Sequence, residues 1–313
     1  MRYIFIINPT AGKRNPYQTV FPQIASYCRQ QGIEYTVHIT AQPRQATELT
    51  RQHGSKGDAV RVYAIGGDGT LSEVAAGAFG MPNVEVGAIP CGSGNDYVKT
   101  FGAAEDFLSP EKQIHAASRW VDMIESNGQR SLNESSVGLD AKVGMESERL
   151  KRILSMGKFV NGPAIYKTAL VKTLFGPLEN HLRICIDGTY FEGNYLFAIA
   201  ASGKYYGGGF CCAPSAVPDD GLLDFILIQK PPLLRIPARV ALFREGKHLT
   251  SPKFNGLLTF RRGKRMSVEA DRPVAANFDG EYRLIQKESF QVLPRAIRFL
   301  LPCDSCFFNK NCK

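Results

Sequence analysis

VRVYAIGGDGTLSEV, from Val60 to Val74, combines a short apolar run, a cluster of glycines and a stretch of helical character. The pattern predicts a strand, a tight turn over Gly66–Gly69, and a helix that begins near Thr70. Glycines let the backbone come close to a ligand, and the unpaired N–H groups at a helix N-terminus favour an anion. We therefore expect this turn to bind a phosphate.

Asp68 lies inside the glycine turn. A carboxylate beside a phosphate is repelled unless a divalent cation or a transferable proton accompanies it. The turn thus favours phosphate chemistry over simple phosphate binding. The alternative is a structural turn in which Asp68 hydrogen-bonds to its own backbone.

The composition is that of a globular protein long enough for two domains: 313 residues, of which 44% are hydrophobic and 21% charged. No apolar stretch approaches the length needed to cross a bilayer, and the chain begins directly with a strand, so we expect a cytoplasmic protein. Its eight cysteines are expected to be reduced. Cys303, Cys306 and Cys312 cluster near the end without a clear fourth ligand, so free thiols are favoured there over a metal site.

The net charge of +9 calls for a polyanionic partner: nucleic acid, an anionic membrane or a charged substrate. Basic residues gather between Arg244 and Arg265, where Glu245 is the one acid. Aromatic residues are not regularly interleaved among them, so nucleic acid is not the expected partner.

Two more polar turns follow predicted strands. The first turn, NPTAGK (8–13), follows the strand predicted at 2–7. The second, CGSGND (91–96), follows the strand predicted at 84–90. Helices are predicted at 17–31, 43–53 and 107–117, and further strands at 33–40 and 120–124. Strands that alternate with helices predict a parallel sheet, which binds ligands at the carboxyl ends of its strands. We therefore expect the three turns to form one nucleotide crevice.

From residue 130 onward the pattern changes to antiparallel strands. They are predicted in SLNESSVGLDAKV (131–143) and in HLRICIDGTYFEGNYLFAIAAS (181–202), where Asp187-Gly188 indicates a hairpin. One amphipathic helical stretch, 145–175, interrupts this all-β region. It is either an interfacial membrane element or a helix pair packed on the sheet.

Two acidic turns stand out in this second half. Asp219 and Asp220 precede the strand predicted at 222–228, and Asp279-Gly280-Glu281 follows a β-rich segment. Asp219 and Asp220 either form a simple turn or hold a hard cation such as Mg²⁺ through a carboxylate, backbone carbonyls and water.

Taken in order, these motifs resemble the soluble bacterial diacylglycerol kinase family of lipid kinases, relatives of sphingosine kinases and, more distantly, of NAD kinases and phosphofructokinases. The match runs over about residues 1 to 302 and rests on NPTAGK, GGDGT (66–70), PCGSGND (90–96), LNESSVGLDAKV (132–143), APSAVPDDGLLD (213–224) and FDGE (278–281). The resemblance implies a Rossmann-like, phosphofructokinase-like α/β nucleotide-binding domain, followed by an antiparallel β-sandwich domain, with the active site in the cleft between them. We set these domains at 1–125 and 126–302, followed by a tail at 303–313.

The resemblance also implies roles for individual residues. The ATP site would comprise Asn8, Pro9, Thr10, Ala11, Gly12, Lys13, Thr40, Gly66, Gly67, Asp68, Gly69, Thr70, Leu71, Ser72, Ser93, Asn95 and Asp96. The metal position would fall on the carbonyls of Val217 and Leu222 and on the side chain of Asp220, supported by Asp122. Glu281 matches the general base proposed for the bacterial lipid kinases, whereas the relatives give weight to the acid of the glycine turn, Asp68. The choice between the two stays open.

We therefore expect an ATP- and Mg²⁺-dependent lipid kinase that phosphorylates the hydroxyl of diacylglycerol or a related lipid. Its basic surplus and the stretch 145–175 would hold it peripherally on the anionic inner face of the membrane. A homodimer is compatible with the sequence. Two alternatives are a kinase of a soluble substrate such as NAD, favoured by Asn133-Glu134, and a non-catalytic regulator that binds nucleotide or nucleic acid. Across the cleft, Asp68 is expected to face Asp220 and Glu281.

Overall fold

The structure is a computed structural model, and it describes residues 1–154, 162–174, 176, 178–232 and 235–302. The cysteine-bearing tail predicted at 303–313 lies outside these residues, as does part of the helical stretch predicted at 145–175. Among the described residues, no helix combines the length and the hydropathy needed to span a membrane.

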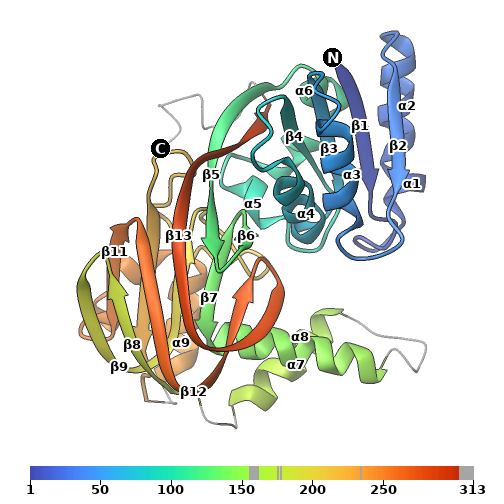
Figure 1. The fold of residues 1–313 in the computed structure, drawn as a ribbon. Coiled ribbons are helices and arrows are strands. Elements are labelled where there is room, and N and C mark those ends of the chain that lie inside the picture. Colours follow the sequence, from blue (N-terminus) through green and yellow to red (C-terminus); the bar gives the residue numbers. More distant parts are fainter. Residues whose placement is uncertain (155–161, 175, 177, 233–234, 303–313) are drawn as a thin grey trace.

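The N-terminal half contains a parallel sheet with helices on its faces (Figure 1). Four strands run in the order β2-β1-β3-β4: β1 (Arg2–Ile7), β2 (Tyr35–Ile39), β3 (Val60–Gly66) and β4 (Val84–Pro90). The strands β3 and β4 are almost continuously apolar because both of their faces are covered. The prediction of a parallel sheet is confirmed.

Alternate residues of β1 belong to two different hydrophobic cores, each covered by its own helix. Ile4 and Ile6 belong to the core beneath α4 (Asp68–Ala78), whereas Phe5 and Ile7 belong to the core beneath α2 (Phe21–Gln30). This division follows from the period of two in a strand. The remaining helices of this half are α1 (Pro16–Thr19), α3 (Gln45–Gly54), α5 (Asp96–Lys99), η1 (Ala104–Leu108) and α6 (Pro110–Ile114).

The helix predicted at 107–117 is only partly correct. A 3₁₀ turn ends at Leu108, and a new helix begins at Pro110 after Ser109, whose hydroxyl caps the amide of Lys112 at 3.3 Å. Proline lacks an N–H and fits the first turn of a helix but not its interior, so the two segments cannot merge. The strand β5 (Ala117–Ser126) already starts at Ala117.

The C-terminal half is a β-sandwich. Its strands are β6 (Gln129–Ser131), β7 (Glu134–Gly138), β8 (Asn180–Ile186), β9 (Thr189–Ala201), β10 (Leu223–Gln229), β11 (Leu258–Gly263), β12 (Arg265–Phe278) and β13 (Glu281–Leu301). The pairing order is β11-β10-β9-β7-β12-β13, and β8 pairs with both β9 and β12. The hairpin predicted at Asp187-Gly188 joins β8 to β9.

The last strand returns to the first sheet. Near its end β13 runs parallel to β4, with Arg298 opposite Glu85 and Phe299 opposite Val86, and antiparallel to β5. An irregularity between Leu293 and Ile297, where Arg295 has a φ of 51°, accompanies the change of sheet. The last strand thus joins the two halves of the chain. The domain boundary at residue 125 stays a prediction.

Helices also occur where the sequence predicted strands. Residues 139–143 open α7 (Leu139–Leu154) rather than extending β7, because Gly138 has a φ of 121° and a Cβ there would lie 2.4 Å from the carbonyl oxygen of Leu196. Both α7 and α8 (Gly162–Leu174) project from the sandwich below the α/β half (Figure 1). A further helix, α9 (Ile236–Arg244), and the short turns η3 (Lys247–Leu249) and η4 (Pro252–Phe254) were not predicted. Helix α9 packs Ile236 and Phe243 onto the sandwich.

Candidate active site

The three polar turns meet at the carboxyl ends of β1, β3 and β4. The amide of Asn8 donates to the carbonyl of Ile65 at 3.0 Å, and the amide of Cys91 donates to the carbonyl of Gly66 at 2.7 Å. The side-chain amide of Asn8 reaches the hydroxyl of Thr70 at 3.3 Å. The expected convergence of these turns is confirmed, while their binding of ATP stays a prediction.

Close backbone packing explains two of the glycines in these turns. Gly12 has a φ of 72°, and a Cβ there would lie 2.2 Å from the carbonyl oxygen of Cys91. A Cβ on Gly92 would lie 2.5 Å from the Cα of Gly67. Any side chain at these positions would push the turns apart.

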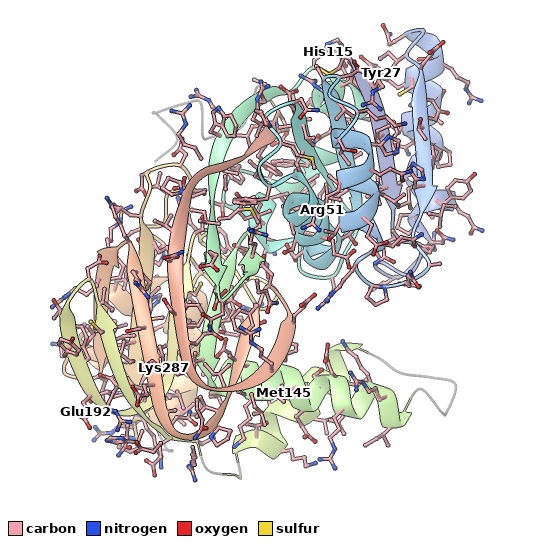
Figure 2. All side chains as sticks on the ribbon, viewed as in Figure 1. Tyr27, Arg51, His115, Met145, Glu192 and Lys287 are labelled. Carbon is pink, nitrogen blue, oxygen red and sulfur yellow. The ribbon has the colours of Figure 1, made fainter. Side chains whose placement is uncertain are left out.

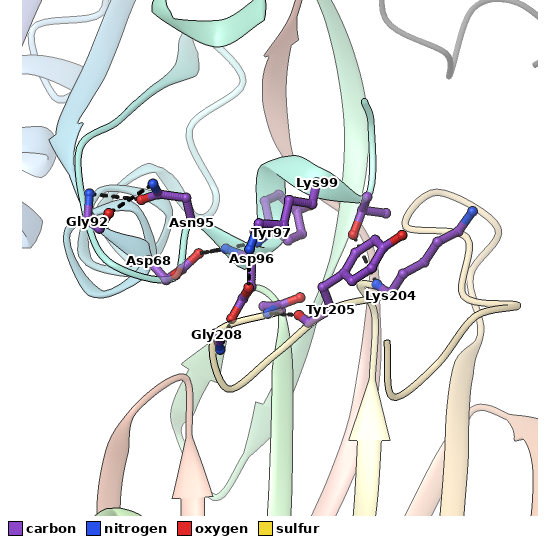
Figure 3. Close-up of polar contacts among 11 residues, drawn as sticks. Asp68, Gly92, Asn95, Asp96, Tyr97, Lys99, Lys204, Tyr205 and Gly208 are labelled. Carbon is purple, nitrogen blue, oxygen red and sulfur yellow. Dashed lines mark hydrogen bonds and ion pairs between the residues drawn. The ribbon is translucent and has the colours of Figure 1, made fainter. Parts of the chain in front are cut away.

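Asp68 joins the glycine turn to the turn that follows β4. Its Oδ1 accepts hydrogen bonds from the amides of Asp96, at 2.7 Å, and Tyr97, at 3.2 Å (Figure 3). These two amides open α5, so Asp68 bonds to the neighbouring turn rather than to its own backbone. Burial and the nearby charge of Asp96 raise the pKa of Asp68 to about 6.

Asn95 and Asp96 hold the turn after β4 in a fixed shape (Figure 3). Asn95 has a φ of 52°, and its side chain exchanges two hydrogen bonds with the backbone of Gly92, at 2.9 and 3.0 Å. The carboxylate of Asp96 accepts from Lys99 at 2.8 Å and from the amide of Gly208 at 2.7 Å. Because Gly208 belongs to the second half of the chain, Asp96 is a link between the two halves.

A second link runs through Asp279, which the sequence analysis did not assign to the site. Its carboxylate accepts from the amides of Leu132, Asn133 and Glu134 and from the hydroxyl of Ser72 at 2.8 Å. Burial raises the pKa of Asp279, and these donors oppose the rise. The sequence indicated this acidic turn only through Glu281, which matches the general base proposed for the family, and it gave no role to Asp279.

Glu281 lies at the rim of this region. Its side chain is 54% exposed, accepts from the side-chain amide of Gln129 at 2.9 Å and lies 3.7 Å from the guanidinium of Arg44. Arg44 precedes α3 of the α/β half, so this ion pair also spans the two halves.

The residues predicted for the metal lie in a separate network around Asp122. The two oxygens of Asp122 accept from the amides of Gly221 and Arg295, at 2.7 and 2.8 Å. Asp220 accepts from the amide of Leu222 at 3.0 Å and from the guanidinium of Arg262. Asp220 thus pairs with Arg262, and the expectation that it faces Asp68 stays a prediction.

We tested whether these groups fit a magnesium ion. Mg²⁺ needs oxygen ligands that converge in near-octahedral geometry. Here both carboxylates already accept from protein donors: Asp122 from the amides of Gly221 and Arg295, and Asp220 from the amide of Leu222 and the guanidinium of Arg262. In this arrangement the carboxylates of Asp122 and Asp220 are therefore engaged by the protein, and the carbonyls of Val217 and Leu222 stay predicted ligands.

Comparison with known proteins identifies the family. Residues 2–126 match the family described as "Diacylglycerol kinase catalytic domain", and residues 134–301 match the "YegS C-terminal NAD kinase beta sandwich-like domain". The chain belongs to the diacylglycerol kinase family of lipid kinases. It is accordingly a phosphotransferase, as the sequence predicted.

Individual relatives in this family span nearly the whole chain. A protein of Pseudomonas aeruginosa named "Probable lipid kinase YegS-like" is 30% identical, over 94% of this chain and 93% of the relative. The diacylglycerol kinase of Bacillus subtilis is 26% identical, over 95% of each chain. A crystal structure of a diacylglycerol kinase from Bacillus anthracis shares the fold, with a TM-score of 0.68 at 20% identity over 96% of both chains.

Proposed function

We propose that the protein transfers the γ-phosphoryl group of ATP to the hydroxyl of diacylglycerol or a related lipid alcohol. The main support is the carboxylate of Asp68, which is fixed by two backbone amides of the next turn. It lies at the start of α4, beside the contact between Asp96 and Gly208. Nucleotide and acceptor would meet at this point.

The ATP phosphates would bind over the glycine turn. The N-terminus of α4 supplies unpaired amides and the positive end of a helix dipole. Lys13 is exposed next to Gly12, which packs so closely against the turn after β4 that a Cβ on it would lie 2.2 Å from the carbonyl oxygen of Cys91. The Mg²⁺ of the reaction would arrive with ATP, as part of the substrate.

Asp68 would act as the general base. Because Oδ1 is occupied by the amides of Asp96 and Tyr97, Oδ2 is the oxygen that takes the proton. The lipid oxygen forms its bond to the γ-phosphorus, the bond from that phosphorus to the bridging oxygen breaks, and the hydroxyl proton passes to Asp68. A pKa of about 6 suits a base that works near neutral pH.

Membrane contact is proposed for the groove between α7 and the sandwich. It has a volume of about 1030 Å³, and its apolar side includes Ile153 and Leu284, which are 56% and 60% exposed. Figure 2 shows Met145, another lining residue, on α7 next to the sandwich. The basic residues that line the groove are Lys142, Arg149, Arg152, Lys172 and Arg272. Glu146 and Glu148 also line the groove, and Glu146 pairs with Lys172 at 2.6 Å and with Arg149 at 3.6 Å. Exposed apolar side chains beside a surplus of basic ones suit an anionic lipid surface.

The buried state of Asn133 and Glu134 argues against a soluble dinucleotide substrate. Glu134 is 4% exposed and accepts from the side-chain amide of Asn277, and Asn133 donates to the carbonyl of Tyr205 at 2.8 Å. These contacts hold both side chains within the sandwich.

The test is a phosphorylation assay with labelled ATP, Mg²⁺ and mixed micelles of candidate lipids, alongside NAD. We expect labelled lipid and no labelled NAD. Asp68→Asn should reduce kcat by about a hundredfold or more, whereas Glu281→Gln should change it by less than about tenfold. The wild-type rate should also fall as pH drops below about 6, where Asp68 becomes protonated.

The assay also decides between the two acids. If Glu281→Gln lost the activity and Asp68→Asn kept it, Glu281 would be the base. If no lipid in a broad panel were labelled, the proposed substrate class would be wrong.

A further inference from the structure

Arg262 lies where the predicted metal loop needs a positive charge. It belongs to β11 and is directly opposite Asp224 of β10 in the antiparallel pair. Its Nε donates to Asp224 at 3.0 Å and its Nη2 donates to Asp220. One guanidinium therefore bridges two carboxylates at the end of the loop 217–224.

Asp220 and Asp224 differ in how deeply they are buried, and therefore in how much they depend on the charge of Arg262. The side chain of Asp224 is 1% exposed and that of Asp220 is 26% exposed. A buried carboxylate is costly unless a cation or several donors accompany it. Arg262 is 36% exposed, so its fork reaches inward from the surface to the buried acid.

The rest of the loop is closed by backbone groups of the protein itself. The amide of Asp122 donates to the carbonyl of Pro218 at 2.7 Å, and the carboxylate of Asp122 accepts from the amide of Gly221 at 2.7 Å. The amide of Leu222 binds Asp220 at 3.0 Å. These bonds tie the loop to β5.

We propose that Arg262 replaces a bound Mg²⁺ in this chain, so that the loop 217–224 assembles without a metal ion. A guanidinium donates in a planar fork that matches two carboxylate oxygens. The guanidinium is part of the chain, whereas Mg²⁺ must lose tightly bound water before it can bind the carboxylates. Any Mg²⁺ requirement of the reaction would then come from ATP alone. This inference concerns loop assembly and does not rest on the proposed reaction.

Thermal unfolding without nucleotide or lipid tests the idea. The wild-type midpoint should be the same in EDTA and in millimolar Mg²⁺. Arg262→Gln should unfold at a temperature lower by about 5–10 °C in EDTA, and Mg²⁺ should restore part of the loss in a saturable manner. Arg261→Gln is the matched control: Arg261 is the next residue of the same strand, and its guanidinium lies over Phe191 instead. It should show no response to Mg²⁺.

A wild-type midpoint that rises with Mg²⁺ as much as that of Arg262→Gln would overturn the proposal. Should Arg262→Gln fail to fold, the metal content of the wild-type protein decides. After dialysis against Mg²⁺ and then metal-free buffer, substantially less than one ion per chain supports the proposal, and one tightly held ion per chain contradicts it. Because neither measurement reads activity, a failed kinase assay would leave this test unaffected.

Discussion

The hydroxyl of Ser72 donates a hydrogen bond of 2.8 Å to Asp279, which lies 207 residues later in the chain. Ser72 is on α4, the helix that begins at the glycine turn, and Asp279 is in the turn between β12 and β13. The acid that binds Ser72 also accepts from the amides of residues 132–134. A single buried carboxylate thus holds the glycine-turn helix against the sandwich.

The two partners of this contact should contribute unequally to stability. Ser72→Ala removes one hydrogen bond and should lower the free energy of unfolding by about 1 kcal/mol. Asp279→Ala leaves several buried amides without an acceptor and should cost about 3–5 kcal/mol. Urea denaturation measures both. Ser55→Ala, which removes only an exposed 3.1 Å bond to Gln52, is the control, and equal losses for all three variants would contradict this account.

Asp68→Asn should make the protein more stable at pH 8 even as it removes activity. Folding raises the pKa of Asp68 from 3.8 to about 6, so the ionised carboxylate costs stability above pH 6, and this cost disappears below about pH 4. Asparagine can still accept from the amides of Asp96 and Tyr97. We expect a gain of about 1–3 kcal/mol at pH 8.

The gain should shrink to zero as pH falls through 6 toward 3.8. Chemical denaturation of both proteins across this range measures it. Asp58→Asn provides the comparison, because Asp58 is 76% exposed and its pairing with Arg2 is loose, at 3.7 Å; it should show little change. A loss of stability in Asp68→Asn at pH 8 would mean that the carboxylate is stabilising instead.

Gly12→Ala should weaken ATP binding specifically. The new methyl group would meet the carbonyl oxygen of Cys91 at 2.2 Å and separate the turns that follow β1 and β4. We expect the KM for ATP to rise about tenfold or more. Gly57→Ala is a matched control, because Gly57 also has a positive φ, 85°, but no atom lies within 4 Å of its added Cβ; it should affect stability alone. Similar KM values for the two variants would argue against the packing of the turns as the cause.

Removal of basic residues from the groove should weaken membrane binding. The triple variant Arg149→Gln, Arg152→Gln and Lys172→Gln removes three cations from its lining, two of which, Arg149 and Lys172, pair with Glu146. At about 1 kcal/mol for each basic residue near an anionic surface, affinity for vesicles containing phosphatidylglycerol should fall roughly tenfold to a hundredfold. Lys287→Gln, an exposed site on β13 labelled in Figure 2, should leave it unchanged. Cosedimentation measures both, and equal binding by the triple variant and the wild type would refute this surface.

Much of this protein follows from local pattern. The glycine turn after β3, the polar turns after β1 and β4 and the alternation of strands with helices are encoded within short windows, and their convergence follows from the rule that parallel strands present their carboxyl ends at one edge. The family could also be inferred from motifs in order. The helical start at Leu139 was missed, because it depends on a contact between Gly138 and β9 that no window of sequence contains.

The tertiary structure determined which residues each acid contacts. Three acids of different segments, Asp68, Asp96 and Asp279, each accept hydrogen bonds from backbone amides of another segment. Asp220 instead pairs with Arg262. The return of β13 to pair with β4 was equally hidden, since strand pairing depends on register across the whole chain. The sequence by itself determined the strands of the parallel sheet and the three polar turns at its edge. The partner of each acid was determined by long-range packing, because the donors come from segments that are distant in sequence.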